Sequence, residues 1–183
     1  MKTTNFFIEL LVIGIGAVIC LISIFYLIIG DQLLHLLQKL DSPLFILPMT
    51  AIVYVLGIVF DRLFDTIISK KDKVLRSDYI EDDEYNVVKS SYYDDSAAVR
   101  QVFDYTKSRI RITRSWMFYF FIIFILSIIY AISSSIGYFY LVGVVLLLLS
   151  WLTYFSWKKL TISFNGLLKT MYTLMTSKKQ EAT

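Results

Sequence analysis

The sequence predicts an all-α membrane protein with four transmembrane helices arranged as two hairpins. Hydrophobic residues make up 57% of the 183 residues and charged residues only 18%, which is too apolar for a soluble domain of this length. The chain also contains four charge-free runs. Each is close to the length of about 20 residues that a helix needs to cross a bilayer core.

The first hairpin is expected within residues 1–69, with helices over about residues 6–29 and 44–68. Glu9 alone interrupts the apolar character of the first helix. Its apolar run is too long for a signal peptide and no small-residue cleavage site follows it, so we expect the helix to be retained.

The second hairpin is expected over residues 116–155, with spans at Trp116–Ser133 and Tyr138–Phe155. These spans are short, but aromatic residues anchor their ends at the membrane surface. The expected anchors are Trp116, Tyr138, Trp151, Tyr154 and Trp157.

Basic residues gather at three helix ends and predict the orientation. Segments rich in Lys and Arg stay in the cytoplasm, so these ends and both termini should lie on the cytoplasmic side of a bacterial inner membrane. The residues are Lys70, Lys71, Lys73 and Arg76, then Lys107, Arg109, Arg111 and Arg114, and finally Lys158 and Lys159.

A cytoplasmic segment is therefore expected over residues 70–115. Its acidic stretch, residues 77–95, is rich in Asp and Glu with interleaved Tyr. The stretch favours either a short β-hairpin, with strands at 85–88 and 91–93, or a solvated loop. No Gly or Pro follows between Ala97 and the end of the third span, so a helix should run unbroken into the membrane.

The tail, residues 156–183, has apolar residues at helical spacing between lysines. This pattern predicts an amphipathic helix that lies on the membrane surface or packs on the cytoplasmic segment.

One face of the second helix carries a narrow polar stripe. Its members are four, three, four and four residues apart, so they share one side of a helix that continues past the membrane surface. Lipid cannot satisfy polar groups. The stripe therefore either lines the pore of an oligomer, with acidic rings that favour cations, or holds neighbouring helices together. It consists of Thr50, Tyr54, Gly57, Asp61 and Asp65.

Glu9 lies inside the apolar start of the first helix, where an unpaired carboxylate is costly. Arg62 is expected at the same depth and is its predicted partner. The alternative is a second acidic ring.

A basic stripe precedes the third span. Four cations on one rigid face can hold a polyanion such as a nucleotide or a short single-stranded oligonucleotide. The positive-inside rule and anionic lipid headgroups offer an alternative explanation. The candidate ligand-binding residues are Arg100, Lys107, Arg111 and Arg114, with Tyr105 for stacking.

No pattern in the sequence indicates an enzyme, a cofactor or a metal site. There is no phosphate-binding glycine loop and no Cys and His spacing of the zinc type. The lone histidine, His35, falls in the external loop, and the lone cysteine, Cys20, falls in the middle of an apolar helix. We therefore expect no catalytic residues, no cofactor and no bound metal.

The junction of Asp61, Arg62 and Asp65, with the run Lys107–Arg114, resembles small membrane effectors of bacterial antiphage systems. The architecture is most similar to the Hailong membrane effector family. The resemblance implies a homotetrameric channel that is controlled by short DNA oligomers from a partner enzyme. It also implies depolarisation of the inner membrane as abortive infection in antiviral defence.

Four helices cannot enclose a wide path alone, so conduction would need several copies around an axis. The leading hypothesis is a homo-oligomeric ion channel gated from the cytoplasmic side. The alternative is a non-conducting membrane anchor or exclusion protein, which recruits a cytosolic partner through the acidic loop and the tail.

Overall fold

The computed structural model describes residues 3–30, 32–33, 45–91, 97–134 and 137–181. This part of the chain forms five helices and contains no strand. The helices are α1 (Thr3–Ile29), α3 (Ile46–Ser77), α4 (Asp82–Ser91), α5 (Ala97–Ser134) and α6 (Tyr138–Glu181).

Four of these helices, α1, α3, α5 and α6, are long and apolar enough to cross a membrane. The prediction of an all-helical chain with four candidate spans is therefore confirmed. The longest, α6, has 44 residues, which corresponds to about 66 Å and is roughly twice the thickness of a bilayer core. Both α5 and α6 must extend well beyond the hydrocarbon region.

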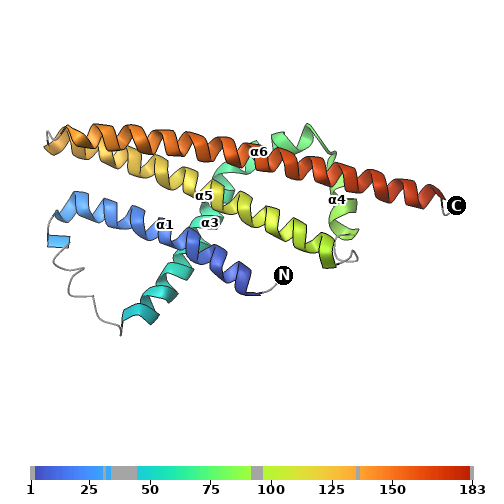
Figure 1. Ribbon diagram of the computed structural model, residues 1–183, viewed down its shortest axis with the longest axis horizontal. Helices are drawn as coiled ribbons and strands as arrows, with labels where there is room; N and C mark the ends of the chain where they lie inside the picture. Colours follow the sequence, from blue (N-terminus) through green and yellow to red (C-terminus); the bar gives the residue numbers. More distant parts are fainter. Residues whose placement is uncertain (1–2, 31, 34–44, 92–96, 135–136, 182–183) are drawn as a thin grey trace.

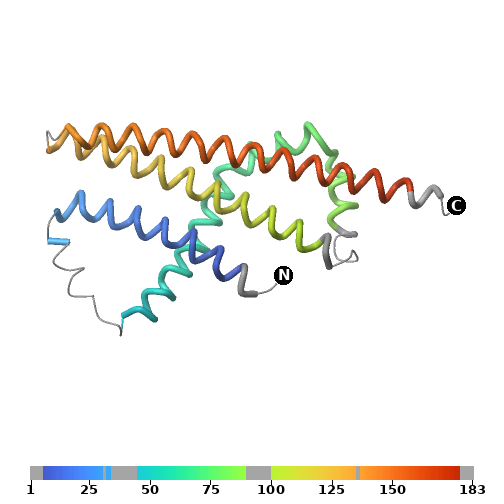
Figure 2. Tube along the Cα trace, in the orientation of Figure 1, coloured from blue at the N-terminus to red at the C-terminus, as the bar shows by residue number. Residues whose placement is uncertain are grey.

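Helices α5 and α6 lie side by side along most of their length and run in opposite directions (Figure 1). Helix α1 packs beside α5. Helix α3 takes a different path: it crosses α1 and α5 steeply and reaches α6 near the middle of that helix (Figure 2). Helices α1 and α3 thus cross, whereas α5 and α6 lie along each other.

Two glycines allow the crossing of α1 and α3. A Cβ atom on Gly57 would lie 2.0 Å from the carbonyl oxygen of Leu10, and one on Gly14 would lie 1.8 Å from that of Val53. No side chain fits in so little space, so the two backbones touch directly, as small residues permit in membrane helices.

The first core cluster joins α1, α3 and α5. Phe64 is stacked on Phe118 with 4.6 Å between ring centroids, and Tyr119 packs edge-on against Phe64. The fully buried Tyr119 ring lies over Gly16 of α1, where a Cβ would approach the ring to 2.3 Å. The buried members of this cluster are Ile13, Ala17, Cys20, Phe64 and Tyr119.

The second core cluster joins α4, α5 and α6. Its buried members are Ile80, Val88, Phe103 and Leu168. The strand predicted over residues 85–88 is therefore wrong, because these residues lie within α4 and place Val88 in this cluster. Three acidic residues occupy the first turn of α4 and Lys89 the last, which suits the helix dipole. Residues 92–93 of the other predicted strand lie outside the described residues.

The unbroken helix predicted from Ala97 into the third span is confirmed as α5. The tail is helical too, but it continues α6 without a break. Its Leu168 packs against α4 and α5, which agrees with the second of the two placements expected for it. The loop with His35 lies outside the described residues.

Candidate functional site: a charged cluster between α1, α3 and α5

A buried arginine joins α5 to α3. The guanidinium of Arg114 donates a hydrogen bond of 2.8 Å to Oδ1 of Asp61, and its other terminal nitrogen bonds to Oδ1 of Asp65. Arg114 is 3% exposed and Asp61 is 4% exposed, whereas the side chain of Asp65 is 53% exposed. The two aspartates lie one turn apart on α3, which lets one guanidinium reach both.

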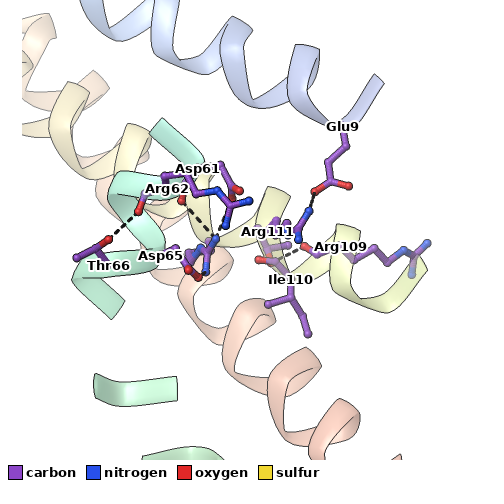
Figure 3. Close-up of polar contacts among 10 residues, drawn as sticks. Glu9, Asp61, Arg62, Asp65, Thr66, Arg109, Ile110 and Arg111 are labelled. Atoms are coloured by element: carbon purple, nitrogen blue, oxygen red, sulfur yellow. Dashed lines mark hydrogen bonds and ion pairs between the residues drawn. The ribbon is translucent and has the colours of Figure 1, made fainter. Parts of the chain in front are cut away.

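A second ion pair joins α5 to α1. Figure 3 shows Glu9 pointing from α1 toward Arg111, and Oε1 of Glu9 lies 3.4 Å from Nη1 of Arg111. Glu9 is only 2% exposed, and its Oε2 atom has no hydrogen-bond partner in the described part of the chain. The prediction that Glu9 pairs with Arg62 is wrong. Arg62 is exposed, because it follows Asp61 on α3 and Asp61 occupies the side of the helix that faces α5.

The two pairs form one cluster because Arg111 and Arg114 are three residues apart on α5 and so lie on the same side of that helix. Each arginine meets carboxylates from another candidate span. Removing one partner of a buried ion pair leaves an uncompensated buried charge, which is strongly destabilising. The cluster therefore fixes how α1, α3 and α5 sit against one another.

The predicted pore stripe divides along the length of α3. Gly57 and Asp61 are buried against other helices of the same chain. Tyr54 is half-buried and stacks on Phe7 with 5.0 Å between centroids. Thr50 is exposed, and its hydroxyl donates to a backbone carbonyl one turn earlier in α3. Only the two ends of the stripe, Thr50 and Asp65, are exposed.

The predicted ligand-binding residues divide in the same way. Arg111 and Arg114 point into the chain and pair with carboxylates. The part of α5 that precedes the predicted third span, residues 97–115, is called the extension of α5. Three of the predicted residues are exposed on it: Arg100, Tyr105 and Lys107. Arg109, which is not among the predicted ligand-binding residues, has its guanidinium 4.3 Å from the centroid of the Tyr105 ring.

The structure also contains buried polar side chains that the sequence reasoning missed. Trp157, predicted as an interfacial anchor, is fully buried, and its Nε1 atom has no partner among the described residues. The hydroxyl of Tyr119 and that of Ser115 are buried and unpaired in the same sense. Ser115 and Tyr119 are four residues apart on the inner face of α5, and this helical spacing is the sequence signal that could identify them.

The chemistry at the charged cluster is electrostatic. Within the described residues, no group of three or more His, Cys, Asp or Glu side chains is placed to hold a metal ion. Ionisable groups inside an apolar span, where they are rare, commonly mark an ion path or a coupling element.

Comparisons with models of protein families, with curated proteins and with solved structures find no match for this chain.

Proposed function

We propose that this protein is a homo-oligomeric ion channel of the bacterial inner membrane, gated from the side that carries α4. We place both termini on the cytoplasmic side. The proposal is supported by four candidate spans and by charged side chains at the point where three of them meet.

The observation that carries the proposal is the charged cluster itself. Glu9 and Asp61 are carboxylates buried within candidate spans, where they persist only with partners. Their partners, Arg111 and Arg114, belong to the helix that also forms the exposed basic extension. A displacement of that extension would reach the two ion pairs without passing through a flexible joint.

Conduction is assigned to the space between copies of the chain. Helix α3 leaves the pair formed by α5 and α6 (Figure 1), and its apolar stretch is mostly exposed within one copy of the chain. Its Asp65 presents an exposed carboxylate that Arg114 compensates only in part. Copies arranged around an axis, with four favoured by the family resemblance, would bring these carboxylates into a ring that attracts cations.

Gating is assigned to an anionic ligand on the extension of α5. Tyr105 is 57% exposed, and Arg109 covers one face of its ring. Arg100 and Lys107, seven residues apart, share another side of the same helix, where Nζ of Lys107 lies 5.8 Å from the centroid of the Phe164 ring of α6. Cations beside an aromatic ring suit a nucleotide or a short oligonucleotide. A partner enzyme that makes such a ligand, and depolarisation in antiphage defence, are parts of this proposal that rest on the resemblance.

One observation favours the non-conducting alternative. Gly57 and Asp61, in the middle of the polar stripe, face α1 and α5 of the same chain. If the stripe serves only to pack one protomer, the protein is an anchor or an exclusion protein that recruits a partner through α4 and the end of α6.

The experiment is a planar-bilayer recording with and without short oligonucleotides on the α4 side. A ligand-gated channel requires that the oligonucleotide alter the current of the wild type and not that of the double variant Arg100→Glu, Lys107→Glu. The matched control is Lys159→Glu, Lys169→Glu, which changes charge equally on α6 and should keep the response. An identical response from all three proteins would refute the assigned ligand surface.

A further inference from the structure

Helix α3 ends its steep path against α6, and contacts on both sides fix the crossing. The amide of Asn165 donates a hydrogen bond of 3.2 Å to the carbonyl oxygen of Leu75. One turn earlier on α3, Nζ of Lys71 lies 5.7 Å from the centroid of the Tyr154 ring on α6. An exposed lysine of one helix is thus held beside an aromatic side chain of another.

A second lysine, Lys158 of α6, lies on the side of α6 that meets α3. Lys158 follows Tyr154 by one helical turn and lies on the same side of α6. Both Lys71 and Lys158 are exposed, and neither forms an ion pair with a carboxylate in the described part of the chain. This differs from Arg111 and Arg114, whose charges are compensated inside the chain. The crossing therefore presents two uncompensated positive charges.

An exposed apolar surface adjoins these charges. Trp151 is 61% exposed and Phe155 is 59% exposed, and their rings stack with 6.3 Å between centroids. Both belong to the apolar run of α6 that ends beside Lys158. Aromatic rings at the end of a span are suited to the boundary between headgroups and acyl chains.

We propose that the crossing of α3 and α6 binds one anionic phospholipid. Lys71 and Lys158 hold its phosphate beside Tyr154, and its acyl chains lie along Trp151 and Phe155. A free phosphate would use the two lysines but gain nothing from the stacked aromatic rings, which is why the surface is assigned to a lipid. The inference does not depend on conduction, since a non-conducting protein would keep the same surface.

The test is a lipid titration of the purified full-length protein, with the bound lipid counted by native mass spectrometry. Phosphatidylglycerol should bind more tightly than phosphatidylcholine. The double variant Lys71→Gln, Lys158→Gln should lose about 25-fold in affinity for phosphatidylglycerol, at about fivefold for each lysine near the surface. The control Lys73→Gln, Lys169→Gln removes the same charge from exposed positions and should lose less than about twofold.

Three outcomes would overturn the proposal. Equal losses in the two double variants would mean that only net charge matters. Equal affinity for the two lipids would remove the headgroup from the recognition. Displacement of the lipid by millimolar inorganic phosphate would identify a free-anion site instead. Unchanged elution and helicity of both variants, measured in parallel, separate any of these outcomes from misfolding.

Discussion

Replacement of Arg114 by leucine removes the cation that compensates the buried carboxylate of Asp61. The side chains of Arg114 and Asp61 are 4% and 5% exposed, so water cannot take over the lost interaction. Breaking a buried pair in this way lowers the free energy of unfolding by about 3–5 kcal/mol. Asp65 adds little to this loss, because its half-exposed carboxylate is hydrated in either protein.

The assay is reversible unfolding in mixed micelles by a denaturing detergent, followed by circular dichroism. The matched variant Asp65→Asn should change the free energy of unfolding by less than about 1 kcal/mol. The double variant Arg114→Leu, Asp61→Leu should recover most of the stability, since apolar side chains can replace a buried pair. A loss below about 1 kcal/mol for Arg114→Leu, or no recovery in the double variant, would refute the assignment of Asp61 as the buried partner.

The same assay checks three further expectations. Gly57→Ala should lower the free energy of unfolding by about 1–3 kcal/mol because no space exists for its Cβ, whereas Gly166→Ala, with no atom within 4 Å, should not lower it. Arg111→Gln should destabilise more than Glu9→Gln, since it strands a buried carboxylate, while the guanidinium left by the other change is 32% exposed; the reverse order would contradict this. Ser150→Ala, which removes a 3.1 Å bond to α5, should cost about 0.6 kcal/mol.

The membrane spans were predictable because bilayer thickness imposes a simple rule on sequence. Charge-free runs of sufficient length identify helices almost independently of what they pack against. The absence of Gly and Pro after Ala97 likewise predicted the unbroken α5, since only local backbone geometry was involved.

The strand predicted over residues 85–88 is wrong because a short run with aromatic and β-branched residues is ambiguous between strand and helix. Tertiary packing decided it. The helical form places Val88 in one cluster with Phe103 and Leu168, which are distant in sequence. The three acidic residues in the first turn of α4 are a local signal for a helix, because they favour the positive end of the helix dipole.

The charged cluster was only half predictable. Spacing correctly placed Asp61 and Asp65 on one side of α3, and Arg111 and Arg114 on one side of α5. It could not give which sides meet, because that depends on the crossing of α1 and α3 at Gly14 and Gly57. The sequence therefore predicts two separate stripes, one acidic and one basic, whereas in the structure their inner members, Asp61 and Arg114, bond to each other.

The most direct measurement of the central claim is single-channel current from the purified oligomer in a planar bilayer under a gradient of potassium chloride. The account predicts discrete current steps with a reversal potential displaced toward that of potassium. It also predicts that Asp65→Asn moves the reversal potential toward zero. A silent bilayer from folded, oligomeric protein would contradict conduction and favour the recruiting role.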